Sequence, residues 1–517
     1  MDESKLSHAK RNITTALALN ILNMLLPFVV RTVFLYTIGV EYMGLNGLFT
    51  SVLSFLNVAD LGIGTAIVYM LYKPVAENNT DEICALLRTC RRFYRIIGAV
   101  MLALGIAVIP FLPTLANGDI PTDINTTAVY LVLLINACMD YFMFGYAETL
   151  FNAHQRVDIY NVTMLCTEFA RLLLQAFVLL AFRSYMLYCI VLPLIAVLKN
   201  LFVYRIARSK YPEYVCRGNI SPERRKELSR QVFGLFISKI SNKLTYDLDN
   251  IVVSSFMGLV LLAKYQNYSI IPQKLTTMVG IVGTSVIPGI GISMVKESRE
   301  KTYENLNTYQ MLYMWLNGWI VICMVVLMNP FICFWLGEGM LLSEYIPIVF
   351  GVYYISTKMN DVCFHYREAA GLWWQERHRA IFSGIFNCVM DIILVQYMGL
   401  TGVMVATILY QFVFDMLWGD MILFRNYFKE YSVKQYLATR LYYLATIATA
   451  GTICWVVCSY IPFDTERSLA ALWHIIERGL ICTVIANAIM LLAYRRLSAY
   501  PNAKRIAAKL IIRKHTV

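Results

Sequence analysis

The sequence predicts an all-α integral membrane protein with about 14 transmembrane helices, and three observations lead to that class. The chain of 517 residues is 58% hydrophobic and only 15% charged, whereas soluble domains average roughly 25% charged residues. Its mean hydropathy is +0.58. Apolar runs of about 20 residues recur along the whole chain, and each is long enough to cross ~30 Å of hydrocarbon as a helix. Too little polar sequence remains for a separate soluble domain.

The apolar runs define the predicted spans in order. They cover 13–38, 44–72, 93–116, 125–151, 158–182, 185–207, 231–257, 259–289, 308–336, 344–371, 378–396, 401–424, 436–461 and 470–494. No small-residue cleavage site interrupts the first run, so we expect it to be retained as a helix rather than removed as a signal peptide. The 13 cysteines lie mostly inside apolar runs and form no CxxC pair. They are therefore expected to be small buried side chains, with neither disulfides nor a metal site.

The connections between the spans alternate in charge. Basic residues concentrate on one side, above all in 208–230 and in the tail after residue 494, while the opposite connections are short and mainly acidic. The positive-inside rule therefore predicts that both termini are cytoplasmic. The same asymmetry accounts for the net charge of +12, because basic residues beside spans contact anionic lipid headgroups. We expect no nucleic-acid partner.

The chain resembles itself when it is shifted by about 219 residues. This shift places Gly39 on Gly258 and Leu56 on Leu275, and it maps spans one to six onto spans seven to twelve in the same orientation. Parallel repeats of this kind occur in transporter folds. The prediction is two parallel six-helix lobes around a central cavity plus two C-terminal helices. The expected divisions are an N-lobe at 1–207, a basic cytoplasmic linker at 208–230, a C-lobe at 231–424, and the last two spans with the tail at 425–517.

Five cationic side chains lie inside spans one, seven and eight, which should flank the cavity: Arg31, Lys239, Lys243, Lys264 and Lys274. Charges inside a membrane are costly and usually face a cavity or a partner. Several converging cations, one of them a guanidinium, favour a phosphate or pyrophosphate ligand. For Arg31 and Lys264 an alternative stays open, in which the side chain extends to the membrane surface.

Two other intramembrane cations have an acid three residues away in the same helix. Arg171 follows Glu168, and Lys358 precedes Asp361. Side chains at this spacing are neighbours on a helix surface. We therefore expect local ion pairs at both positions.

Three intramembrane acids are candidates for coupling or charge balance. Asp60 is isolated in the middle of span two and could bind a proton or Na⁺, unless helix-packing partners satisfy it. Asp247 and Asp249 are the acids of span seven, and Asp247 lies four residues after Lys243, so those two side chains could neutralise one another. No nucleotide-binding GxxxxGK[ST] pattern is present in the sequence.

The stretches R-T-V-F-L-Y-T-I-G-V-E-Y-M-G-L-N-G-L-F (31–49) and A-D-L-G-I-G-T-A-I-V-Y-M-L-Y-K-P (59–74) resemble the polysaccharide-transporter branch of the MOP superfamily, the Wzx-type flippases. A-K-Y-Q-N-Y (263–268) is similar to the same family's pattern. The resemblance implies a bacterial cytoplasmic-membrane protein that moves an undecaprenyl-pyrophosphate-linked oligosaccharide from the inner to the outer leaflet. It also implies a central cavity lined by spans one, two, seven and eight, with Arg31 at a matching basic position.

The resemblance further implies no catalytic residues and no cofactor. The expected partners are the lipid-linked glycan, anionic membrane lipids and the polysaccharide polymerase machinery, and we expect a monomer. Three alternatives stay open. They are a flippase for a lipid II-type peptidoglycan precursor, a multidrug exporter of the same superfamily, and a membrane glycosyltransferase or polymerase that uses the D-x-D formed by Asp247 and Asp249.

Overall fold

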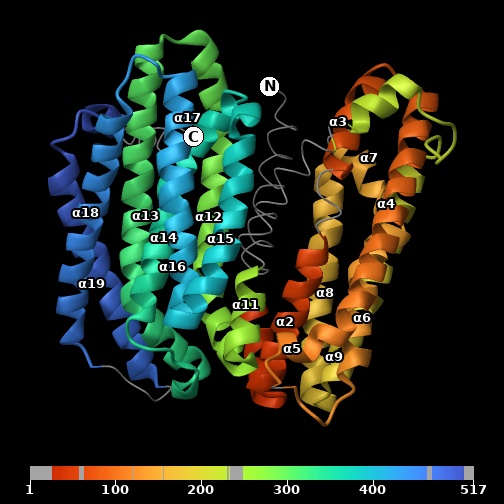
Figure 1. Cartoon of the computed structure of the whole chain (residues 1–517), viewed down its shortest axis with the longest axis horizontal. Coiled ribbons are helices and arrows are strands. Elements are labelled where there is room, and N and C mark those ends of the chain that lie inside the picture. Colours follow the sequence, from red (N-terminus) through yellow and green to blue (C-terminus); the bar gives the residue numbers. More distant parts are fainter. Residues whose placement is uncertain are drawn as a thin grey trace, which may run out of the picture. The chain divides into compact units, whose positions relative to one another are not determined.

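The computed structural model describes residues 26–57, 63–118, 120–154, 156–229, 232, 248–462 and 468–505. All the regular elements in these residues are helices (Figure 1). Among the described residues, eight helices are long and apolar enough to cross a membrane, or nine if one bent pair counts as a single span. The all-α membrane class is thereby confirmed. Predicted spans one and seven begin outside the described residues, and only their later parts are seen, as Leu26–Thr37 and Leu248–Met257.

The chain divides into two compact units, 1–263 and 264–517. The predicted borders at residues 207, 230 and 424 remain predictions. The first unit contains the helix Leu26–Thr37 and these elements: α2 (Val40–Leu56), α3 (Ile63–Ala76), α4 (Thr80–Val108), η2 (Ile109–Phe111), α5 (Leu112–Leu115), α6 (Thr126–Phe142), α7 (Ala147–Ala153), α8 (Val157–Phe182), α9 (Tyr185–Lys210) and α11 (Leu248–Met257). Predicted span two thus consists of α2 and α3, and span four bends by 52° between α6 and α7.

Helix α12 (Leu259–Lys296) begins in the first unit and continues into the second unit from residue 264. The other elements of the second unit are α13 (Arg299–Leu336), η3 (Glu338–Met340), α14 (Ile346–Ala369), α15 (Trp373–Met398), α16 (Leu400–Tyr410), η4 (Gln411–Trp418), α17 (Gly419–Asn426), α18 (Val433–Ser459) and α19 (Leu469–Tyr494). The last two helices, α18 and α19, pack against each other and against α13 (Figure 1).

The predicted 219-residue shift relates helix starts in the structure. Gly39 has φ 114° and Gly258 has φ 83°, and α2 and α12 begin at the residue after each glycine. Only glycine adopts such a φ without steric cost, so both chain reversals depend on it. Asn79 and Ser298 cap α4 and α13 through their side chains, and they too lie 219 residues apart. The repeat is therefore visible at the level of individual caps.

Helix α2 approaches the start of α12 very closely within the first unit. A Cβ atom placed on Gly44 would lie 2.0 Å from the carbonyl oxygen of Leu259. No side chain fits at that distance, because the obstructing atom belongs to the backbone. Gly44 therefore permits backbone contact on one face of α2, and a side chain on the opposite face is free to line a pocket.

The second unit contains a fully buried ion pair. Arg440 on α18 and Asp420 on α17 are both 0% exposed and form an ion pair. The Arg440 guanidinium also donates a hydrogen bond of 2.7 Å to the carbonyl oxygen of Met359 and another to the side chain of Asn360. A buried guanidinium needs such partners, because an uncompensated charge in the interior is strongly unfavourable.

Candidate functional site: a polar pocket beside two arginines

Arg31 lies on the helix Leu26–Thr37 and is half-buried. One turn later, the Phe34 ring packs edge-on against Tyr185 and Tyr188 of α9, with ring centroids 5.8 and 4.9 Å apart. Arg31 and Arg171 both lie close enough to Tyr188 to interact electrostatically with its hydroxyl group. Two arginines from different helices of the first unit therefore belong to the electrostatic environment of one tyrosine.

Arg171 on α8 forms the predicted local ion pair. Its Nε donates to Glu168 Oε2 at 2.8 Å, its Nη2 pairs with the other carboxylate oxygen, and its Nη1 donates to Gln175 Oε1 at 2.6 Å. These contacts fix the orientation of the guanidinium. They use three of its five N–H donors, so two donors are left for a ligand.

A pocket of about 380 Å³ lies beside Arg171 within the first unit, between α2, α6, α8 and α9. Its lining residues are Asn46, Thr50, Leu53, Ser54, Asn57, Leu133, Asn136, Ala137, Arg171, Tyr188 and Leu192. Most of its polar groups are neutral amides and hydroxyls. The volume is within the ~300–1,000 Å³ that is usual for small-molecule sites.

A second pocket of about 150 Å³ shares Asn57 and Ala137 with the first. It is charged rather than neutral, because Lys199 Nζ lies 2.7 Å from the carboxylate of Asp140. Asn200 Nδ2 donates to the same carboxylate at 2.6 Å. The polar surface therefore continues through the first unit from an arginine end to an ion-paired end.

The other predicted site residues are distributed as follows. Lys239, Lys243, Asp247 and Asp60 lie outside the described residues. Asp249 is 4% exposed on α11 in the first unit. Lys264 and Lys274 are half-buried on α12 in the second unit, and neither forms an ion pair with another residue in the described part of the chain. Convergence of the lysines with Arg31 stays a prediction.

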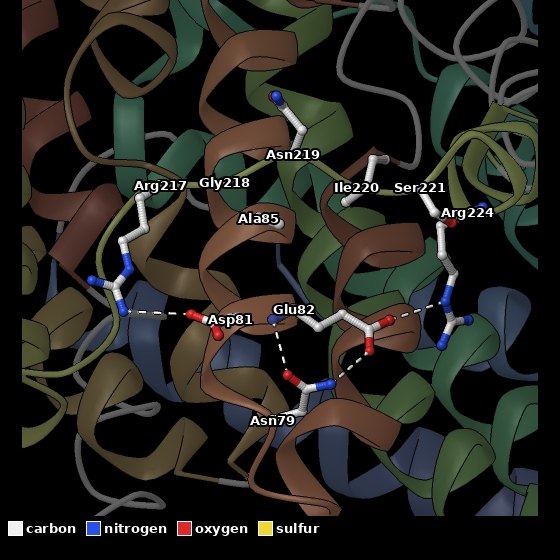
Figure 2. Close-up of a pocket in the computed structure, with 10 residues that line it drawn as sticks. All are labelled: Asn79, Asp81, Glu82, Ala85, Arg217, Gly218, Asn219, Ile220, Ser221 and Arg224. Carbon is white, nitrogen blue, oxygen red and sulfur yellow. Dashed lines mark hydrogen bonds and ion pairs between the residues drawn. The ribbon is translucent and has the colours of Figure 1, made fainter.

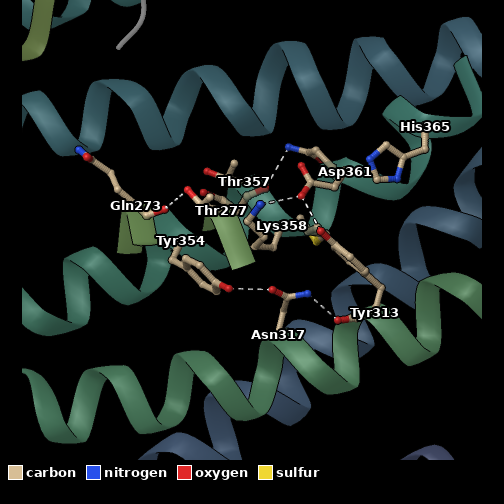
Figure 3. A network of polar contacts seen from close by, with 12 residues as sticks. Gln273, Thr277, Tyr313, Asn317, Tyr354, Thr357, Lys358, Asp361 and His365 are labelled. Carbon is tan, nitrogen blue, oxygen red and sulfur yellow. Dashed lines mark hydrogen bonds and ion pairs between the residues drawn. The ribbon is translucent and has the colours of Figure 1, made fainter. Parts of the chain in front are cut away.

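The second predicted local pair, Lys358–Asp361, belongs to a polar network in the second unit (Figure 3). Lys358 Nζ and the Tyr313 hydroxyl both donate to Asp361 Oδ2 at 2.7 Å. Asn317 accepts from the hydroxyl of Tyr354 at 2.8 Å and donates to the carbonyl oxygen of Tyr313 at 2.8 Å. Lys358 is only 2% exposed. Its charge is neutralised in place, so we do not include Lys358 in the anion site.

The segment after α9 forms a surface pocket of about 650 Å³ with the start of α4 (Figure 2). Arg224 Nε lies 3.0 Å from Glu82 Oε1, and Arg217 Nη2 lies 3.5 Å from Asp81 Oδ1. Arg88 donates to the carbonyl oxygen of Gly218 at 3.0 Å. The sequence predicted only a basic linker here. The structure shows that the linker is bound to the first unit up to residue 229, and its cations are partly neutralised there.

The docked linker contacts a histidine at the end of α7, which should make docking depend on pH. His154 stacks on Tyr211 and Tyr214, with ring centroids 4.4 and 5.5 Å apart. Burial lowers the pKa of His154 below 6.5, and nearby Glu213 opposes this in part. His154 therefore binds a proton more readily when the linker is released than when it is docked, so docking is strongest above pH ~6.5 and weakens as the pH falls below it.

We expect proteolytic cleavage after Arg217 to accelerate severalfold between pH 7.5 and 5.5. The rate at each pH is normalised to cleavage of a free peptide that covers residues 211–229. His154→Gln should make the normalised rate independent of pH. An unchanged pH dependence in that variant would assign the effect to another group.

Comparison with known proteins identifies the family to which the chain belongs. A family profile described as "Polysaccharide biosynthesis protein" matches residues 9–294, which is more than half of the chain. The chain belongs to this family. No curated protein sequence matches it.

Solved structures show the same fold across most of the chain. The inward closed conformation of the lipid II flippase MurJ covers 93% of this chain and 99% of its own, with a TM-score of 0.69 and 13% identity. An inward-facing multidrug resistance MATE transporter of the MOP superfamily covers 77% of this chain and 94% of its own, with a TM-score of 0.63 and 15% identity. A MOP superfamily transporter from Pyrococcus furiosus covers 80% and 94%, with a TM-score of 0.55 and 15% identity. At these identities the likeness establishes the fold alone.

The neutral part of the pocket was not among the predicted site residues. Asn46, Thr50, Ser54 and Asn57 follow one another at spacings of four, four and three. At 3.6 residues per turn their side chains project from α2 within an arc of about 80° around the helix axis. These residues carry no charge, so the pattern of charged residues in the sequence does not indicate them. Their helical spacing is the sequence signal that does.

Proposed function

We propose that the protein is a flippase that moves an undecaprenyl-pyrophosphate-linked oligosaccharide from the inner to the outer leaflet, by alternating access, for surface polysaccharide assembly. The observation that carries this proposal is the pocket lined by Arg171, Tyr188 and neutral polar side chains, with Arg31 in the electrostatic environment of that tyrosine, in a member of the polysaccharide biosynthesis family. Guanidinium groups suit phosphate oxygens, which they bind with paired hydrogen bonds. Lys239, Lys243, Lys264 and Lys274 complete the proposed cationic cavity.

The nearest alternative substrate is a lipid II-type peptidoglycan precursor, because the fold matches the lipid II flippase over 93% of this chain. Both substrates carry a pyrophosphate between a polyprenyl chain and sugars, so the same cations would serve either. A multidrug exporter is disfavoured because the proposed site is cationic. A glycosyltransferase is disfavoured because Asp249 of the D-x-D is 4% exposed on a helix.

The proposed location is the bacterial cytoplasmic membrane, with both termini in the cytoplasm as the positive-inside rule predicts. Anionic lipids and the polysaccharide polymerase machinery are the proposed partners, and the proposed form is a monomer. Flipping needs no bond-making chemistry, so neither a catalytic residue nor a cofactor enters the mechanism. Asp60, Asp247 and Asp249 are proposed for coupling or charge balance.

The test uses the purified full-length protein in liposomes that contain undecaprenyl-pyrophosphate-linked oligosaccharide on one leaflet. We expect the protein to expose the glycan on the other leaflet, where an added glycosidase cleaves it. Lipid II is assayed in parallel and identifies the alternative substrate if it moves faster. Transfer of sugar between lipids, with no movement across the bilayer, would establish the glycosyltransferase instead.

A further inference from the structure

The pocket beside Arg171 has a chemistry that the anion site does not explain. Asn46, Thr50 and Asn57 on α2 face it together with Asn136 on α6. These groups are neutral, so they contribute no charge to the binding of phosphate. The polar stripe on α2 runs over 12 residues, from Asn46 to Asn57, or ~17 Å of helix, which is more than one phosphate group requires.

Several of these groups remain available to a ligand. The side-chain amide of Asn136 makes no hydrogen bond to another protein group within the described residues. The Thr50 hydroxyl donates only to the carbonyl oxygen of Asn46 at 2.7 Å, in its own helix, and it can still accept. An exposed amide or hydroxyl of this kind is hydrated in the empty pocket, and a ligand with hydroxyl groups can replace that water without loss of hydrogen bonds.

Apolar side chains also line the pocket. Leu53, Leu133 and Leu192 stand among the amides and hydroxyls. A sugar ring carries the same mixture of groups, because hydroxyls project from its edge and C–H groups cover its faces. A drug-like organic cation lacks the hydroxyl edge, and an inorganic anion lacks the apolar face.

We infer that this pocket is a saccharide subsite, which binds the sugars next to the pyrophosphate while Arg31 and Arg171 bind the pyrophosphate itself. The inference rests on the proposed function, since it assumes a lipid-linked glycan as the substrate. It predicts how the bound substrate is oriented within the first unit. The phosphates lie at the arginine end near Tyr188, and the first sugars extend along α2 toward Asn57.

Thr50→Val and Asn136→Ala test the subsite. No other side chain depends on either group in the described structure, so each change removes a ligand contact and leaves no buried partner unsatisfied. The matched control is Thr449→Val on α18. Thr449 is also exposed, and its hydroxyl also donates to the carbonyl oxygen four residues earlier, at 2.8 Å.

Binding is measured on the full-length protein in nanodiscs with two kinds of probe, undecaprenyl pyrophosphate without sugar and the same lipid with one to three sugars attached. The sugars should tighten binding to the wild-type protein at least tenfold. Each variant should weaken binding of the glycosylated lipid by about two- to tenfold, the usual effect of one hydrogen bond. Binding of the sugar-free lipid should not change, and Thr449→Val should behave as wild type.

The saccharide subsite is refuted if a protein that carries both Thr50→Val and Asn136→Ala still binds the glycosylated lipid as much more tightly than the sugar-free lipid as the wild type does. It is equally wrong if the wild-type protein gains nothing from the sugars yet still binds undecaprenyl pyrophosphate. Failure of the proposed function is a different result, in which the wild-type protein binds neither probe and moves neither across the bilayer.

Discussion

Replacing Arg31 by glutamine should lower the transport rate of the lipid-linked oligosaccharide by about 10- to 100-fold. A hydrogen bond to a charged group contributes ~1.5–3 kcal/mol, and the guanidinium cannot be replaced by a neutral amide in binding pyrophosphate. Arg31→Lys should retain part of the activity, because it keeps the charge and loses the paired geometry. The measurement is glycan exposure in reconstituted liposomes, with membrane insertion checked separately. In cells, the lipid-linked oligosaccharide should accumulate on the cytoplasmic leaflet.

The matched control for Arg31 is Arg205→Gln, which removes one positive charge from an exposed position on α9 in the same unit. That variant should transport normally. Lys243→Gln and Lys274→Gln test whether the lysines belong to the same site, and each should also reduce transport. Normal transport by the Arg31, Lys243 and Lys274 variants would refute the anion site.

Replacing Asp420 by asparagine should lower the free energy of unfolding by about 3–5 kcal/mol, because it leaves Arg440 as a buried charge without its counter-ion. Both residues are 0% exposed. The effect should appear as a large fall in the unfolding temperature of the solubilised protein. Transport by the folded fraction should be preserved, since neither residue lies in the proposed site.

The control for Asp420 is Glu304→Gln. Glu304 pairs with Lys301 at 2.8 Å, but both side chains are about half exposed, so loss of the pair should cost only ~0–1 kcal/mol. A double variant that also carries Arg440→Gln should be less destabilised than the sum of the two single changes. Equal effects of Asp420→Asn and Glu304→Gln would show that the buried pair contributes little.

The sequence predicted those features that depend on local spacing. Hydropathy located the spans because a membrane requires about 20 apolar residues in a row. The pairs Arg171–Glu168 and Lys358–Asp361 were predicted because residues three apart always adjoin on a helix. The 219-residue shift was detectable because the two reversals need glycine at Gly39 and Gly258.

Contacts between distant segments were not predictable in this way. Nothing in the spacing of Asp420 and Arg440 identifies them as partners, because they lie on different helices whose packing decides the pair. The same holds for Arg31 and Arg171, which both lie near Tyr188 only because of how three helices pack. The neutral pocket was not predicted for another reason. Amides and hydroxyls are less costly in a membrane than charged groups, so their presence in a transmembrane helix does not by itself indicate a site.

The docked linker has a consequence for how the chain is made. All of its described partners, among them Asp81, Glu82, Arg88 and His154, precede it in the sequence. Domains fold in order as the ribosome releases them, so these partners are already inserted when residues 211–229 emerge. Residues 211–229 can therefore dock on the helices that precede them while the rest of the chain is still being synthesised.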